Sequence, residues 1–268
     1  MLGKLMKYEF KACGRIFFPL YIGILFLAAV NGVSIGSSIK DQDGFILDPN
    51  TLNTQGILTL VMVALFVALF VITIVLTIQR FNKSLLEDEG YLMFTLPVKT
   101  SSLVLSKLLV ALIYAIISAV VALLSFLIIG AIGGNVNIVE FFKFLSQESM
   151  FGENIDFIIY MNLWFLLSYI IFVLSIYLSL SIGQLPQFSK YKMPAGVVLF
   201  FIINLIISKI ETFMRNMTIG SSPEVDLMNS IASISYKYLF ISSLISIIIG
   251  IILFFLINFI LNKKLNLE

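Results

Sequence analysis

Three consecutive acidic residues, Glu87, Asp88 and Glu89, form the densest run of carboxylates in the sequence. Adjacent carboxylates repel one another when they are ionised, so a cationic surface placed against them relieves that repulsion. Apolar and aromatic residues follow in the same segment, 80–102, and such side chains need cover from lipid or protein. The pattern predicts a docking element for another protein. The alternative is a solvated charged loop beside a membrane-surface anchor.

The residues after the three acids indicate how this segment folds. Gly90 permits a sharp bend, and Pro97 stops a helix from propagating. A hydroxyl group accepts a hydrogen bond from the free N–H groups that begin a helix. Thr100 or Ser101 is therefore expected to cap the helix that follows.

Missing residue types exclude most other chemistry. The chain has no histidine, which excludes Ser-His catalysis, zinc-His-Glu peptidase sites and His-ligated haem. It has no Gly-rich phosphate loop ending in Lys and Ser or Thr, so it does not hydrolyse nucleotides by that route. The single cysteine, Cys13, permits no internal disulfide. We expect no catalytic residue, metal ligand or cofactor in this chain.

The elements that position the acidic segment are predicted from hydropathy. The chain is 60% hydrophobic and 12% charged, with a mean hydropathy of +1.07, whereas about 25% of residues in soluble domains are charged. A helix needs about 20 apolar residues to cross the roughly 30 Å hydrocarbon layer. Six blocks meet this length: 16–38, 56–79, 103–132, 157–182, 194–210 and 238–261. We predict one all-α domain, 1–268, which is a polytopic transmembrane bundle of six helices.

The orientation is predicted from Lys and Arg, because cytoplasmic segments carry an excess of these residues. With both termini inside, twelve of the 17 Lys and Arg residues lie on the cytoplasmic side and five lie outside. Acidic residues have the opposite bias, with five inside and ten outside. Segment 80–102 then faces the cytoplasm and 211–237 forms an extracellular loop. The overall charge of +2 does not indicate a nucleic-acid partner.

The first 15 residues have the pattern of an amphipathic helix. Lys4, Lys7, Lys11 and Arg15 are spaced three, four and four residues apart, which places them on one helical face. The opposite face is formed by Leu2, Leu5, Met6, Phe10 and Cys13. We expect an interfacial helix whose cations lie among anionic lipid head groups. The alternatives are a basic leader without defined structure and a cleavable signal peptide.

The predicted spans contain no Asp, Glu, Lys or Arg near their centres, which disfavours ion-coupled transporters and intramembrane aspartyl proteases. Most of the polar residues within these spans are uncharged. Four of them are candidates for lining the path of an amphipathic substrate, or alternatively for hydrogen bonding between helices: Asn162, Tyr169, Tyr177 and Asn204. Small residues spaced by four let helices approach closely. This pattern predicts helix packing at Ser175, Ser179, Ser242, Ser246 and Gly250.

The basic leader, the segment from Glu87 to Pro97 and the six-span layout together resemble permease subunits of ABC-2-type transporters, especially bacterial peptide and antibiotic exporters. The likeness extends to exporters of phenol-soluble modulins and covers nearly the whole chain. It implies that the leader is an interfacial helix and that the loop holds a cytoplasmic coupling helix. The ATPase contacts that it implies are Glu87, Asp88, Glu89, Gly90, Tyr91, Leu92 and Pro97.

The resemblance also implies partners and a location. The expected partners are a cytosolic ABC ATPase that binds ATP and Mg, a second permease copy or a related permease, and membrane lipid. The expected location is the bacterial cytoplasmic membrane. The chain itself is then a transport component and not an enzyme. The alternative function is a passive channel or a toxin-immunity protein without ATP coupling, and a third class is an intramembrane enzyme.

Overall fold

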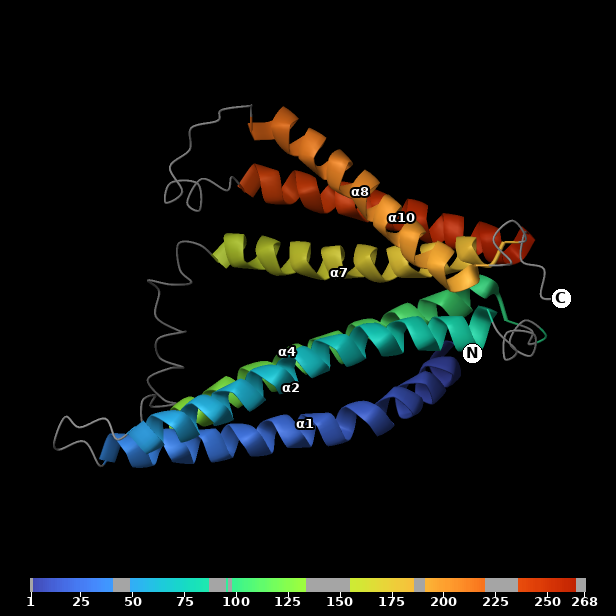
Figure 1. Cartoon of the computed structure of the whole chain (residues 1–268). Helices are drawn as coiled ribbons and strands as arrows, with labels where there is room; N and C mark the ends of the chain where they lie inside the picture. Colours follow the sequence, from blue (N-terminus) through green and yellow to red (C-terminus); the bar gives the residue numbers. More distant parts are fainter. Residues whose placement is uncertain are drawn as a thin grey trace. The chain divides into compact units, whose positions relative to one another are not determined.

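The computed structural model describes residues 2–40, 49–86, 95, 98–133, 155–185, 191–219 and 236–263. The long helices in these ranges are α1 (Leu2–Lys40), α2 (Pro49–Phe81), α4 (Thr100–Ile132), α7 (Ile155–Gly183), α8 (Lys192–Ile219) and α10 (Tyr236–Lys263). Figure 1 shows their order along the chain. All six are long and apolar enough to cross a membrane. The prediction of an all-α bundle with six spans is confirmed.

The helices are longer than the predicted spans. One such difference is at α8, which continues to Ile219 through the first third of the predicted outer loop, 211–237. Lys209 and Glu211 lower the hydropathy of this part but do not interrupt the helix, because both residue types are compatible with helical backbone. Helix α8 thus extends about two and a half turns beyond the end of the predicted span at Ile210, and the extracellular loop 211–237 stays a prediction.

Helix α1 joins the leader and the first span without a break. It has 39 residues, which corresponds to about 58 Å, longer than the roughly 30 Å hydrocarbon layer. Pro19 lies inside it, and a proline removes one intrahelical hydrogen bond and favours bending. Figure 1 shows that α1 is curved. The helical state predicted for the leader is confirmed, whereas its location in the membrane surface stays a prediction.

The chain divides into two compact units. The N-terminal unit comprises Gly3–Leu76 and Leu109–Glu153, which includes nearly all of α1 and most of α2 and α4. The C-terminal unit comprises Met1–Leu2, Thr77–Leu108 and Asn154–Glu268, which includes α7, α8 and α10. Helices α2 and α4 therefore each contribute to both units. Their ends next to the acidic segment belong to the C-terminal unit.

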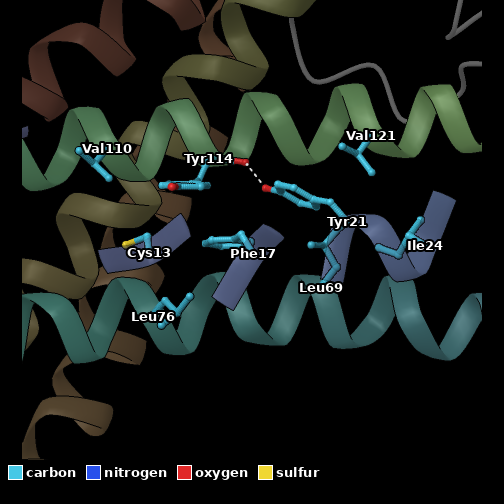
Figure 2. Packing of buried hydrophobic residues seen from close by; sticks show 9 residues of the cluster. All are labelled: Cys13, Phe17, Tyr21, Ile24, Leu69, Leu76, Val110, Tyr114 and Val121. Atoms are coloured by element: carbon cyan, nitrogen blue, oxygen red, sulfur yellow. Dashed lines mark hydrogen bonds between the residues drawn. The ribbon is translucent and has the colours of Figure 1, made fainter. Parts of the chain in front are cut away.

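The core of the N-terminal unit is organised around Tyr114 of α4. Its ring stacks on Phe10 at a centroid distance of 4.8 Å and on Phe17 at 4.6 Å. Its hydroxyl donates a 2.7 Å hydrogen bond to the carbonyl oxygen of Phe10. The hydroxyls of Tyr21 and Ser118 form a second bond of 2.8 Å. Figure 2 shows the rings of Phe17, Tyr21 and Tyr114 between α1 and α4, with Leu69 and Leu76 of α2 beside them.

Farther along α1, two glycines allow close contact with the end of α4. A Cβ at Gly32 would lie 2.9 Å from the Cβ of Ile132, and a Cβ at Gly36 would lie 3.0 Å from the carbonyl oxygen of Ile132. At Gly32 a side chain would force a shift of Ile132, and at Gly36 the neighbouring backbone would have to give by a few tenths of an ångström. The four-residue spacing of Gly32 and Gly36 is the small-residue pattern that brings membrane helices together.

We predict that Gly32→Val lowers the free energy of unfolding by about 1–3 kcal/mol, because the added methyl groups overlap Ile132 and force the helices apart. Gly23→Val is the matched control, since no atom lies within 4 Å of a Cβ at this position of the same helix. Unfolding in an SDS titration, followed by circular dichroism, measures both variants. Equal losses in the two variants would contradict the close-packing interpretation.

Candidate functional site

The residues expected to contact an ATPase lie outside the described residues: Glu87, Asp88, Glu89, Gly90, Tyr91, Leu92 and Pro97. Their role stays a prediction. The structure does describe both attachments of this segment, since Arg80–Leu86 precede it and Val98–Ser102 follow it. These attachments show which helices the two ends of the segment contact.

On the preceding side, α2 changes into a short π-helix, η1 (Asn82–Leu86). A π turn holds an extra residue, is rare and often occurs at functional sites. Four of its five residues have buried side chains: Asn82, Ser84, Leu85 and Leu86. The hydroxyl of Ser84 donates a hydrogen bond to the carbonyl of Arg80, which holds the turn to the end of α2.

The stack of Phe81 on Tyr177 fixes this turn to α7. The two rings are nearly parallel, with centroids 4.1 Å apart and planes 10° apart. Phe81 is 0% exposed and Tyr177 is 1% exposed. Stacked aromatic pairs contribute about 0.5–1.5 kcal/mol beyond the burial of their area. The end of α2 therefore has little freedom to move independently of α7.

On the following side, α4 begins at Thr100 and is attached to α10. The hydroxyl of Thr100 donates a 2.9 Å hydrogen bond to the side-chain oxygen of Asn262. The carbonyl of Lys99 accepts the first helical bonds, from the N–H of Ser102 at 2.9 Å and of Leu103 at 3.4 Å. The position before α4 is thus occupied by Lys99, and the predicted cap at Thr100 or Ser101 is wrong.

One buried cation lies two turns into α4. Lys107 is 5% exposed and belongs to the same unit as both attachments. A buried ammonium group requires polar partners, and Lys107 has at least one interaction. The sequence pattern identified Lys107 only as a cytoplasmic charge, because its burial depends on helices that are distant in the sequence.

Three of the four path candidates make contacts between helices. The side chain of Tyr169 is hydrogen bonded to Thr77, and Tyr177 stacks on Phe81. The amide of Asn204 donates to Ser175 Oγ at 3.3 Å and to the carbonyl of Phe200 at 2.8 Å. These contacts favour the interhelical alternative for Tyr169, Tyr177 and Asn204. The fourth candidate, Asn162, is exposed on α7 and has an interaction of its own, so its role stays a prediction.

The small residues of α7 lie against α8. Ser175 is fully buried, and its hydroxyl donates to the carbonyl of Phe172 at 2.8 Å while accepting from Asn204. A Cβ at Gly196 of α8 would lie 3.7 Å from the carbonyl oxygen of Ser179, in ordinary contact. Both serines thus leave room for α8, as small residues at helix contacts do.

The small residues of α10 have a different setting. Ser242 bonds to the carbonyl of Leu239 at 3.1 Å, and Ser246 is 2% exposed. Among the described residues, no atom lies within 4 Å of a Cβ at Gly250, so the structure shows no close approach of two backbones there. The packing role of Gly250 stays a prediction. The space beside it belongs to a cavity.

This cavity lies between α4, α7 and α10, all within the C-terminal unit, and has a volume of about 260 Å³. Its walls include Leu108, Leu174 and Phe254, and its polar side chain is that of Ser246. A cavity with such walls accommodates apolar groups and offers no charge to an ion. Sequence reasoning identified Ser246 and Gly250 but not the void, whose existence depends on the three helices together.

The leader carries its cations on an exposed face. Lys4, Lys7, Lys11 and Arg15 are all exposed, whereas Cys13 on the other face is 6% exposed and packs in the core beside Tyr114. From Phe10 onward, the apolar face therefore contacts protein as well as any lipid. Among the described residues, no group of three or more His, Cys, Asp or Glu residues is arranged to hold a metal ion.

We predict that Phe81→Ala lowers the free energy of unfolding by about 3–5 kcal/mol, because it removes the ring from a filled site. Phe70→Ala is the matched control in α2, since Phe70 is 66% exposed and its loss is expected to cost less than about 1 kcal/mol. The fluorescence of Trp164 in α7, the only tryptophan, reports unfolding. Similar losses in the two variants would show that the stack is not a strong attachment.

Comparisons with known proteins add no relative. A scan against protein-family models gives no match. A search of curated proteins and a search of solved structures also find no similar chain. An assignment of function therefore depends on the chemistry of this chain itself.

Proposed function

We propose that this chain is the membrane-spanning permease subunit of an ATP-driven exporter of hydrophobic or amphipathic cargo, such as a peptide toxin, an antimicrobial peptide or a drug. The observation that carries the proposal is the attachment of the acidic segment at both ends to one unit, through Phe81 to α7 and through Thr100 to α10. A loop that serves only as a connection does not need two such attachments.

In this proposal the energy enters by protein contact. A cytosolic ABC ATPase with ATP and Mg binds the segment that begins at Glu87, and its closure pushes on that segment. The buried Phe81 ring transmits the push to Tyr177, because close-packed rings resist compression. The hydrogen bond from Thr100 carries it to Asn262. Helices α7 and α10 are then displaced relative to α4, which changes the cavity between the three helices.

The cavity between α4, α7 and α10 supports the class of cargo. Its apolar walls offer nothing to an ion or a sugar, whereas an apolar side chain of an amphipathic peptide fits about 260 Å³. Two copies of the chain, or one copy with a related permease, would provide a path for the whole cargo. The proposed setting is the bacterial cytoplasmic membrane with both termini in the cytoplasm.

We predict that replacing Glu87, Asp88 and Glu89 with alanine weakens binding of the proposed partner ABC ATPase about tenfold or more, which is about 1.4 kcal/mol. The loss of three charges removes the attraction to a cationic surface. Replacing Asp41, Asp43 and Asp48 is the matched control, since these three acids lie in a predicted outer loop. Co-purification and ATPase stimulation measure both variants.

Two outcomes contradict this proposal. If the unaltered chain neither retains the ATPase nor changes its turnover, then the chain is not a permease of this kind and the passive alternative gains support. If the first triple variant binds as well as the second, the acidic segment is not the contact.

The charge bias predicts that both termini lie in the cytoplasm. Two single-cysteine variants in a Cys13→Ala background test this orientation. Lys99→Cys is expected to react with a membrane-impermeant maleimide only in inside-out vesicles. Met217→Cys, at a 68% exposed position of α8, is expected to react only in right-side-out vesicles. The Cys13→Ala chain alone measures the background. The reverse pattern would place the acidic segment away from cytoplasmic ATP.

A further inference from the structure

A groove of about 470 Å³ runs along the leader part of α1 within the N-terminal unit. Gly3, Met6, Lys7, Phe10 and Lys11 line it from α1, and Val110 lines it from α4. The positions on α1 follow the three- and four-residue spacing of one helical face, so the groove is parallel to the helix axis. On one side of the groove is the face of α1 that carries the lysines, and on the other is the face that packs in the core of the unit.

The two sides of the groove differ in chemistry. Lys7 and Lys11 are one turn apart, which is about 6 Å along the axis, so two ammonium groups can reach one phosphate. Both lysines are exposed, and neither has a hydrogen bond or ion pair with the part of the chain that the structure describes. Met6, Phe10 and Val110 form the apolar side. The groove is thus positively charged along one edge and apolar along the other.

The apolar side is held in place by Tyr114. The Tyr114 ring stacks on Phe10, and its hydroxyl bonds to the carbonyl of Phe10 at 2.7 Å. Val110 lies one turn before Tyr114 in α4 and is 3% exposed. Phe10 nevertheless keeps 41% of its surface exposed. A ring that is fixed but open provides a preformed wall, which lowers the entropic cost of binding.

We propose that this groove binds one molecule of an anionic phospholipid, with the phosphate between Lys7 and Lys11 and the first part of an acyl chain along Met6, Phe10 and Val110. Charge complementarity requires an anion, and the apolar wall requires a ligand that is amphipathic. Lys11 is five residues before Ile16, the first residue of the predicted span, which is about 7 Å along the axis. That distance places the lysines at head-group depth. A lipid fits these conditions better than free phosphate.

The site differs from general attraction between a basic helix and a membrane. General attraction depends on the number of positive charges and falls off with salt, so each leader cation contributes alike. The affinity of a defined binding site depends instead on which positions carry the cations. Lys4 and Arg15 are exposed cations of the same helix, but they do not line the groove. They therefore provide a matched control with the same change in charge.

The experiment counts bound lipid on the purified full-length chain by native mass spectrometry, with phosphatidylglycerol or phosphatidylcholine added to the detergent solution. We expect one tightly bound phosphatidylglycerol and no equally tight phosphatidylcholine. Lys7→Ala with Lys11→Ala is expected to weaken phosphatidylglycerol binding at least tenfold, while Lys4→Ala with Arg15→Ala changes it less than twofold. Circular dichroism checks that every variant keeps its helices.

A second variant tests the groove without a change in charge. Gly3→Leu adds a side chain where no atom lies within 4 Å of a Cβ, so the helix tolerates it while the groove is filled. Binding is expected to fall at least tenfold. Undiminished binding to this variant would overturn the proposal, as would equal losses in the two lysine and arginine pairs or no preference for phosphatidylglycerol. Complete displacement by millimolar inorganic phosphate would show that the anion alone is recognised.

No ATPase and no transport measurement enters this experiment. Its failure would therefore leave the exporter proposal unchanged. Likewise, the lipid site stands if the exporter proposal fails.

Discussion

A helix gains no hydrophobic free energy when it leaves lipid for a neighbouring helix, because the lipid tails are as apolar as its side chains. The folding of this chain therefore depends on shape and on hydrogen bonds between helices. Gly32 and Gly36 allow the backbones of α1 and α4 to pack closely, because they carry no side chain. Tyr21 and Asn204 provide hydrogen bonds, and in hydrocarbon their polar groups have no water as an alternative partner. Each unit has its own set of such contacts.

The six helices could be predicted because the bilayer imposes a length and a polarity that are visible in the sequence. The ends of these helices could not be predicted, as α8 shows. Hydropathy reports preference for lipid, and Lys209 and Glu211 reduce it, but the backbone remains helical to Ile219. The leader is a similar case. Its periodicity predicted a helix, whereas its continuity with the first span depends on the tolerance of Pro19 within α1.

The candidate site was predicted in part. The charge pattern identified the acidic segment, but its attachments join residues that are far apart in the chain. Phe81 and Tyr177 are 96 positions apart in the sequence, and no local pattern indicates that their rings stack. Tyr177 was a candidate for lining a path because of its polarity, and the structure buries it against a ring instead. Long-range contacts of this kind require the fold.

Pro19 has a consequence for how one continuous helix contacts its neighbour along its whole length. It removes the N–H that would pair with the carbonyl of Arg15, at the boundary between the charged and apolar parts of α1. A missing helical bond favours a bend at this place. Phe10 and Phe17 before Pro19 stack on Tyr114 of α4, and Gly32 and Gly36 after it lie against the end of α4. The bend therefore belongs to a helix that is held on both sides of the proline, so its angle is fixed by packing against α4.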